Sequence, residues 1–507
     1  MKSFELMQRL ARQAVGTTVF TIVTAAVASG AGAVSSPATN LTAAAGLDTL
    51  TLDQCLSEAR ENNHRRPATR FAVAIAEAQH RQALAGYWPQ INASGGYQRM
   101  NQSPDFLFPA GQMQLPAGSA VVTVPAGVLG PAAVQLPVST PAQTIQVPAQ
   151  DVKLMDPDNY TASVNATWLL YDGGMRQGLR EQTAGLVEMM KQEARRTDLE
   201  ITDSVKRFYY GAVLARQLHE DGADTLARME ATLNLTEAMY KEGSGKVMKT
   251  DWLENKVMVE TLRAMVALLE KNDALARAAL ANTMGRPWDA SVFPADAEIP
   301  FAPVVGSLND LVGSAYQFNP DWAGIEAGLS AAEGALRTAR SGYYPKLALT
   351  GEVHKWWNDY NAGIATDRNK EGWTVGVGLE FPLFNGFLTK NKVAETRARL
   401  AQIKQEQFLL KDGLGIQIKD AFLGLDAAEK SFQATREAMN AAGENRDLYT
   451  RAYQNGLVET EKVVRAQLME ALMIAQHDKA RYDHVAWESQ LGVLVGTEVL
   501  KRLNVTP

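Results

Sequence analysis

The sequence predicts a mainly α-helical protein with amphipathic strands, which suit either a membrane β-barrel or a soluble sandwich, built from a duplicated helix–strand–strand–helix unit. Three observations predict it: a long internal repeat, short segments in which apolar and polar residues alternate, and long proline-free stretches that follow those segments. Alternation has the two-residue period of a strand with one apolar face. The proline-free stretches have the 3.5-residue period of closely packed helices.

The N-terminus predicts export from the cytoplasm. A basic start, an apolar run at 14–27 and small residues after it predict a signal peptide over 1–33, followed by a linker over 34–48. A short membrane anchor is the alternative, although the apolar run falls short of the roughly 20 residues of a spanning helix. The only cysteine, Cys55, cannot form an internal disulfide. The formal net charge of −6 argues against nucleic acid as a partner.

The repeat is visible in two pairs of motifs. GYWP at 86–89 recurs as GYYP at 342–345, an offset of 256 positions. LLYDGG at 169–174 recurs as PLFNGF at 382–387, an offset of 213 positions. A repeat of this length indicates a duplicated domain-sized unit. We therefore expect four parts after residue 48: a first repeat at 49–285, an inter-repeat linker at 286–306, a second repeat at 307–497 and a C-terminal tail at 498–507.

Each repeat contains two segments that read as strands. We expect them at about 88–101, 159–171, 344–357 and 371–384. Each is close to the 9–11 residues that a tilted strand needs to cross a bilayer. Aromatic residues near the ends of these segments fit an interfacial belt. A soluble β-sandwich also alternates, so the strands alone leave both architectures open.

An insertion of 43 positions separates the two strands of the first repeat. It is rich in proline and carries one charged residue between 102 and 150, Asp105. Frequent proline disfavours a helix. We expect a long surface loop over about 102–158, extracellular if the strands form a barrel; a ligand-binding lid is the alternative.

Beyond each strand pair the chain reads as a long helical hairpin. From Gly173 to Tyr240 there are 68 residues without proline, enough for roughly 100 Å of helix. Small and apolar residues recur along them with a 3.5-residue period, which predicts a close-packed coiled coil. This seam starts with Val205, Phe208 and Ala212 in the first repeat and runs from Ile418 to Arg446 in the second, through Ala421, Leu425 and Ala428. A second helix is expected to return from a turn near residue 245. The motif Tyr-x-x-Gly marks both turns, at Tyr240–Gly243 and at Tyr453–Gly456.

The repeated YDGG and FNGF motifs lie where the period changes from strand to helix. Tyr171 and Phe384 are expected to end strands. Four residues are expected to form the strand-to-helix junctions: Asp172, Gly173, Asn385 and Gly386. The aspartate and asparagine are good helix N-caps, because a side-chain oxygen can accept a bond from a free amide of the first turn. The glycines allow a tight bend.

Together these features resemble the outer-membrane efflux protein (TolC) family along about residues 50–496. The resemblance rests on the GYWP and GYYP junctions, the LLYDGG and PLFNGF motifs, the Tyr-x-x-Gly tips and the terminal LGVLVG. It implies a homotrimer in which each chain gives four strands to a 12-stranded barrel in outer-membrane lipid, continued by a long α-helical periplasmic tunnel. Four strands cannot close a barrel and an open edge cannot face lipid, so a closed ring of copies is also expected on physical grounds.

The resemblance implies an exit duct of a tripartite efflux or type I secretion system. Such a duct passes substrates to the exterior from an inner-membrane transporter and a periplasmic adaptor (membrane fusion) protein. Adaptor docking is implied at the helix tips, at Tyr240, Gly243, Tyr453, Gly456 and Leu457. A periplasmic gate is implied at Lys249, Asp251, Glu459, Glu461, Lys462 and Arg465.

The gate departs from the family pattern. Family members commonly carry two inward aspartates, three residues apart, after the second tip, and the matching positions here are Lys462 and Arg465. Two interpretations remain. The cations are solvated or paired with Glu459 and Glu461, or they form trimeric rings that face the pore and attract anions.

Two other classes of protein compete with a channel. An enzyme would need a catalytic motif, and the sequence contains no nucleophile motif, P-loop or dinucleotide fingerprint. His477 and His484 lie seven positions apart and could suggest a metal site, but a solvated polar face needs no ligand. We expect no catalytic residue, cofactor or metal. A periplasmic coiled-coil adaptor protein would share the long helices but not the four strands.

Overall fold

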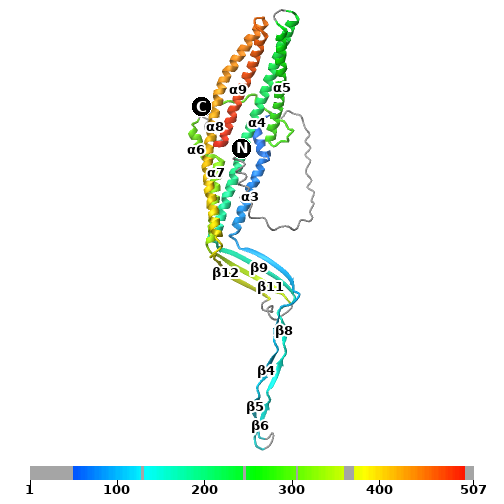
Figure 1. Ribbon diagram of the computed structural model, residues 1–507, viewed down its shortest axis with the longest axis vertical. Helices are drawn as coiled ribbons and strands as arrows, with labels where there is room; N and C mark the ends of the chain where they lie inside the picture. The colour runs from blue at the N-terminus through cyan, green and yellow to red at the C-terminus, as the bar shows by residue number, and fades with distance from the viewer. Residues whose placement is uncertain (1–48, 127–130, 244–246, 304–305, 359–369, 497–507) are drawn as a thin grey trace. The chain divides into compact units, whose positions relative to one another are not determined.

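The computed structural model (Figure 1) describes residues 49–126, 131–243, 247–303, 306–358 and 370–496. The expected signal peptide, the linker that follows it and the C-terminal tail over 498–507 lie outside these ranges.

Two sets of four helices recur in the same order. The first set is α2 (Leu52–Asn62), α3 (Arg65–Ala85), α4 (Met175–Lys241) and α5 (Lys249–Thr283). The second set is α6 (Leu308–Phe318), α7 (Pro320–Arg340), α8 (Leu388–Gln454) and α9 (Thr460–Val495). Helices α4 and α8 have 67 residues each, which corresponds to roughly 100 Å. In the parts of the chain that the structure describes, no helix is both long and apolar enough to cross a membrane.

The four expected strands form one antiparallel sheet. They are β2 (Gln90–Arg99), β9 (Asp158–Tyr171), β11 (Lys346–Trp357) and β12 (Glu371–Glu380), in the order β12–β11–β9–β2. The fourth strand is shorter than expected. It stops at Glu380, so Phe384 does not end a strand, whereas Tyr171 does.

The register gives this sheet one apolar and one polar face. Val164 lies opposite both Ala93 and Val353, and Val353 lies opposite Trp373. Residues directly opposite each other point to the same side of a sheet. The apolar face therefore carries Ile91, Ala93, Tyr97, Tyr160, Val164, Trp168, Leu347, Leu349, Val353, Trp373, Val375, Val377 and Leu379.

The insertion between β2 and β9 is not the irregular loop that we expected. It forms three two-stranded antiparallel ladders in succession (Figure 1). The ladders are β3 (Asp105–Phe108) with β8 (Gln150–Lys153), β4 (Gly111–Leu115) with β7 (Gln143–Val147), and β5 (Gly118–Val124) with β6 (Val134–Thr140). Its prolines lie outside the ladder strands, at positions such as Pro116 and Pro141 where no ladder bond is lost, with the exception of Pro137 within β6.

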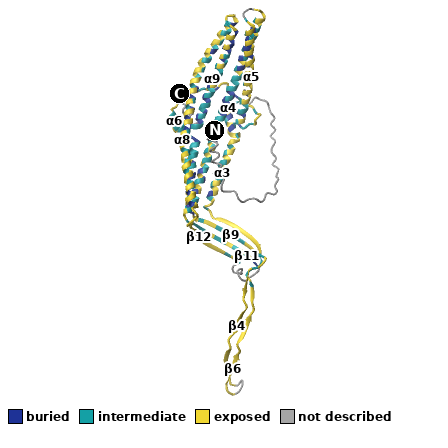
Figure 2. Ribbon diagram, viewed as in Figure 1, coloured by how far each residue is buried: buried dark blue, intermediate teal, exposed yellow. Residues whose placement is uncertain are grey.

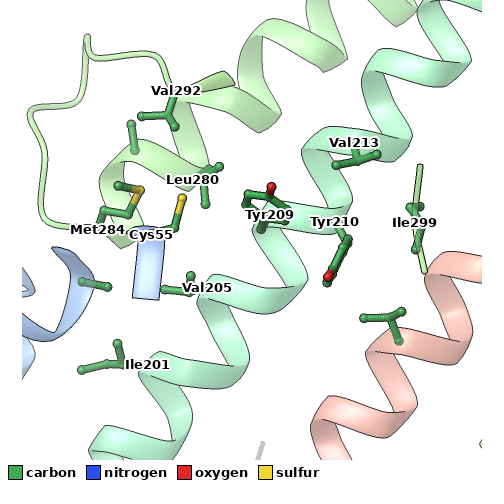
Figure 3. Close-up of a cluster of buried hydrophobic side chains, with 13 residues drawn as sticks. Cys55, Ile201, Val205, Tyr209, Tyr210, Val213, Leu280, Met284, Val292 and Ile299 are labelled. Atoms are coloured by element: carbon green, nitrogen blue, oxygen red, sulfur yellow. The ribbon is translucent and has the colours of Figure 1, made fainter. Parts of the chain in front are cut away.

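Among the described residues, three buried clusters stabilise the helical part: one of Met229, Val259, Leu262 and Val464, and two that correspond between the repeats. Of these two, the first packs Cys55, Val205, Tyr209 and Leu280 together with residues of the inter-repeat linker, whose Phe293–Pro294 (β10) pairs with Thr49–Leu50 (β1) (Figure 3). The second contains Leu311, Ala315, Leu414, Ile418, Leu491 and Val495. Cys55 and Leu311 are 256 positions apart, and Val205 and Ile418 are 213 apart, so the offsets of the sequence repeat also relate the two cores.

Candidate functional site

The first strand-to-helix junction is built on an ion pair. The Asp172 carboxylate accepts hydrogen bonds from the amides of Gly174 (3.0 Å) and Arg176 (2.9 Å) and from the Arg176 Nε (2.7 Å). Burial alone would raise the pKa of Asp172, but these bonds and the arginine charge hold it below its usual value. Arg176 also donates to the carbonyls of Gly86 and Leu170 and lies over the Tyr87 ring. It therefore ties the GYWP corner to the end of β9.

The second junction uses neutral groups at the equivalent positions. Asn385 Nδ2 donates to the Thr389 hydroxyl (2.6 Å), which in turn lies 3.5 Å from the Gly342 carbonyl of the GYYP corner. Positions 172 and 176 are replaced here by 385 and 389, so the ion pair of the first repeat becomes an amide–hydroxyl pair. The repeated motif keeps the contact and changes its chemistry.

Both long helices begin after the predicted N-cap residues, Asp172 and Asn385. Helix α4 has Gly174 at its N-cap and helix α8 has Phe387, both with positive φ. Asp172 still satisfies a first-turn amide from outside the helix, but Asn385 has no such bond and is not a cap. The tight bend needs left-handed backbone at Gly173 (φ 64°) and Gly386 (φ 63°), which glycine adopts without strain.

The helix tips end in the same backbone conformation. Gly243 and Gly456 both have φ of 68°. At the second tip the Gly456 amide donates to the Tyr453 carbonyl (2.8 Å) and the Leu457 amide to the Ala452 carbonyl (3.0 Å), the pattern of a Schellman C-cap. Leu457 is 76% exposed at the turn, an apolar group without a packing partner in one chain.

The two tip tyrosines are not equivalent. Tyr240 is partly exposed and stacks on Trp252 of α5. Tyr453 is buried, and its hydroxyl lies 2.7 Å from the Thr236 hydroxyl and accepts a hydrogen bond from Thr460 (3.1 Å). Asn255 Nδ2 donates to the same Thr236 hydroxyl. This buried layer joins α4, α5, α8 and α9, and no spacing pattern in the sequence predicts it.

A buried carboxylate lies further along α9. Glu470 is 2.7 Å from Arg446 of α8 and 3.6 Å from Arg228 of α4. The longer distance allows an ion pair but no hydrogen bond. One carboxylate therefore lies close to two cations from two different long helices. The sequence did not predict this site, because Arg446 occupies a position of an otherwise apolar seam.

The proposed gate residues lie near the tips on exposed surface. Arg465 pairs with Glu461 (3.2 Å), with both side chains largely in solvent. Asp251 accepts a bond from the Met248 amide (2.9 Å) and so caps the start of α5. The remaining side chains of this set, those of Lys249, Glu459 and Lys462, are exposed in the single chain. For Arg465, the pair with Glu461 agrees with the interpretation that the cations are solvated or paired with neighbouring glutamates. An exposed pair of this kind contributes little stability.

The two histidines of α9 face a buried aromatic cluster. His484 lies 4.5 Å from the Phe301 ring and His477 lies 4.8 Å from the Phe432 ring, measured between centroids. Burial lowers the pKa of both imidazoles. Over the described ranges, no group of three or more histidine, cysteine, aspartate or glutamate side chains could hold a metal ion.

We predict that replacing Gly243 and Gly456 with valine will impair efflux. Valine at positive φ is strained, and relief of that strain would change the direction of the chain that leaves each helix. The measurement is drug susceptibility of cells, beside quantification of the protein in outer membranes. Gly415→Ala is the control, because Gly415 lies within α8 and an added Cβ meets nothing within 4 Å. Full efflux in the double valine variant would place adaptor docking elsewhere.

Comparison with known proteins agrees with this architecture. A family model described as outer membrane efflux protein matches residues 143–286 and 311–497. The chain is 25% identical over 232 residues to the pyoverdine export outer membrane protein OpmQ of Pseudomonas aeruginosa, covering 45% of this chain and 47% of OpmQ. It therefore matches about half of that relative. It is 22% identical over 348 residues to the outer membrane efflux protein BepC of Brucella suis, covering 68% of this chain and 72% of BepC.

Solved structures share the fold. The outer membrane protein VceC of Vibrio cholerae superimposes with a TM-score of 0.67 at 16% identity, covering 88% of this chain and 96% of that one. A membrane protein from Pseudomonas aeruginosa gives a TM-score of 0.68 at 17% identity, covering 89% and 93%. At these identities the likeness concerns the fold alone.

Proposed function

The chain belongs to the outer membrane efflux protein family, and we propose that it forms a homotrimeric exit duct in the outer membrane. The duct would pass substrates from an inner-membrane transporter and a periplasmic adaptor protein to the exterior, without catalysing a reaction. The single observation that supports this most strongly is the four-stranded sheet. It has an apolar face open to solvent and, at each edge, a strand whose outer side is unpaired.

The apolar face of the sheet fits lipid better than water. Trp373 is 74% exposed, and Val353 and Val375 are 60% and 66% exposed. Figure 2 shows the sheet coloured largely as exposed. A contiguous apolar surface of this size marks a contact with a membrane or another protein. The opposite face carries Asn92, Ser163, Thr350 and Thr374, which suits a water-filled lumen.

The edges of the sheet support three copies. Among the strands that the structure describes, β2 pairs with β9 alone and β12 with β11 alone, so each leaves one side of its backbone unpaired. Unpaired backbone groups cannot face hydrocarbon. Pairing β2 of one copy with β12 of the next removes every edge when the ring closes, and three copies give the 12 strands that the family resemblance implies.

The helices favour the same assembly. Helix α5 carries an apolar stripe on its exposed side, formed by Leu253, Val257, Met265 and Leu268. These positions recur at helical spacing, as expected of a coiled-coil face that packs on a neighbour. In a trimer this stripe would meet the helices of the next copy and complete a tunnel wall.

Fractionation tests the proposed function. We expect the protein in outer membranes as a heat-sensitive trimer that forms pores in planar bilayers. Heat-sensitive migration would be read on gels of unboiled and boiled outer membranes. Recovery as a monomer in the periplasm or the inner membrane would instead favour the adaptor, and an outer-membrane monomer without pores would also contradict an exit duct.

The charge of the entrance can be tested in the same pores. If Lys462 and Arg465 face the lumen, the wild type should prefer anions in a salt gradient, and Lys462→Asp/Arg465→Asp should shift the reversal potential toward cations. Lys462→Gln/Arg465→Gln provides the graded control and should give an intermediate value. A reversal potential that is the same in all three proteins would mean that these cations lie outside the lumen.

A further inference from the structure

The insertion of the first repeat forms a hairpin that we call the ribbon, Asp105–Lys153. It directly continues the strand pair β2·β9, because the Met100 amide donates to the Pro157 carbonyl and the Leu154 amide to the Pro104 carbonyl, both at 2.8 Å. Positions 106–150 contain no charged residue, although 21% of the whole chain is charged. The ribbon is therefore an ordered and nearly neutral extension of the sheet, with a composition unlike the rest of the protein.

The ladder β4·β7 has one apolar and one polar face. Met113 lies opposite Ile145, and Gln112 lies opposite Gln146. Directly opposed residues share a face and neighbours along the strand alternate. One face therefore carries Met113, Leu115, Ile145 and Val147 with one polar residue, Gln143, and the other carries Gln112, Gln114, Thr144 and Gln146.

The ladder β5·β6 repeats this division. Val122 lies opposite Leu136, and the next pair, Thr123 and Gln135, is on the other side. The first face carries Ala120, Val122, Val124, Val134, Leu136 and Val138. The second carries Ser119, Thr123, Gln135 and Ser139, together with the opposed pair Val121 and Pro137. Each of the two ladders therefore has one predominantly apolar face that a partner could cover.

Among the residues that the structure describes, no segment covers these apolar faces. Val122 and Val138 are 49% and 50% exposed, and the other large apolar residues of the two faces are exposed as well, apart from the half-buried Val124. An isolated two-stranded ribbon is marginally stable in water, and both of its edges offer unpaired backbone groups. A partner would bury the apolar face and explain why the sequence keeps it.

We propose that the partner is the same ribbon of the two other copies in the trimer, so that three ribbons pack through their apolar faces beyond the barrel. This rests on the proposed function. Each copy carries its ribbon on β2·β9, so trimerisation would bring three identical ribbons together at the same rim. Tethering of this kind gives effective concentrations in the millimolar range, at which a modest apolar contact is enough. Because the surface is neutral, identical copies can also meet without charge repulsion.

The composition argues against a lipid surface as the partner. Surfaces that lie on membranes combine apolar groups with cationic residues and interfacial tryptophan or tyrosine. Between positions 109 and 150 the ribbon has no lysine, arginine, tryptophan or tyrosine. Glutamine, serine and threonine on its polar face are instead suited to water.

Site-specific cross-linking in intact outer membranes tests the packing. Wild-type Cys55 is fully buried, and burial raises the pKa of its thiol to about 11, so a Cys55→Ala background leaves one added thiol per chain as the reactive group. Val122→Cys and Met113→Cys should give covalent dimers with a short bismaleimide, since one thiol per chain can join only two copies. The matched controls Thr123→Cys and Gln112→Cys, on the polar faces of the same ladders, should stay monomeric on boiled gels.

Unboiled gels and an aqueous maleimide dye separate the outcomes. Trimers in which apolar-face and polar-face cysteines cross-link equally poorly would overturn the three-ribbon packing and leave the proposed duct intact. Apolar-face cysteines that neither cross-link nor react with the dye would point to a lipid surface and would also overturn it. Absence of any trimer in the Cys55→Ala parent and in wild type would contradict the proposed function itself, and the inference with it.

Discussion

Gly334→Ala is expected to destabilise the protein strongly, whereas Gly324→Ala on the same helix is expected to be tolerated. A Cβ added at Gly334 would lie 2.4 Å from the Gln182 amide nitrogen and 2.7 Å from the Gly178 carbonyl oxygen. Both are backbone atoms of α4, so neither can rotate away. At Gly324 the nearest atom is the Gln192 Cβ at 3.9 Å, an ordinary contact.

The size of the effect follows from how α4 and α7 meet. Overpacking a close contact costs about 1–3 kcal/mol or more, and a clash of backbone against backbone belongs to the upper end of that range. Alanine at Gly324 should instead stabilise the helix by about 0.5–1 kcal/mol. Because α4 belongs to the first half and α7 to the second, the clash would separate the halves beside strands β9 and β11.

Urea unfolding of the purified protein and the yield of heat-sensitive trimer measure this effect. Gly334→Ala should lower both, and Gly324→Ala should leave trimer yield unchanged with an equal or higher midpoint. Similar midpoints for the two variants would show that the α4–α7 contact accommodates an added methyl group without loss of stability. The close-packing argument would then be wrong.

The coarse architecture was predictable from the sequence because it depends on periodicity and repetition. The family resemblance is confirmed, and with it the expectation of an outer-membrane efflux protein. The long helices follow the proline-free stretches, and the seam positions Ile418, Ala421, Leu425 and Ala428 are buried. In the first repeat the seam prediction is wrong at Phe208. Its side chain is 43% exposed, and those of Tyr209 and Tyr210 are buried instead. A period places a stripe on a helix only to within one residue.

What the sequence could not predict depends on contacts between distant segments. The ribbon was expected as a loop because frequent proline excludes a helix, and the ladder register that places prolines between strands appears only when both arms are paired. Asn385 reads as a cap by residue type, but its side-chain amide donates to the Thr389 hydroxyl and accepts no bond from a first-turn amide of α8. The close approach of Gly178 and Gly334 joins positions 156 apart that no motif connects.

Glu470→Ala is expected to destabilise the helical part by about 3 kcal/mol, because removing one partner of a buried ion pair leaves its counter-charges uncompensated. The Glu470 side chain is 8% accessible, against 23% for Arg446 and 32% for Arg228. Both arginines keep a second carboxylate, Asp447 and Asp224 respectively, which limits the loss. The effect should therefore lie at the lower end of the 3–5 kcal/mol that breaking a buried pair costs.

A matched exposed pair separates burial from charge. Asp426 pairs with Lys430 on α8 at 2.7 Å, the same distance as Glu470 from Arg446, but with side chains 49% and 73% accessible. Asp426→Ala should therefore cost about 0.5 kcal/mol or less. The urea midpoints of both variants and of Arg446→Ala, combined with Glu470→Ala in a double-mutant cycle, measure the coupling across α8 and α9. If Glu470→Ala costs no more than Asp426→Ala, or if the cycle gives no coupling, the buried carboxylate does not hold α4, α8 and α9 together, and the stability of this region must come from the apolar seam alone.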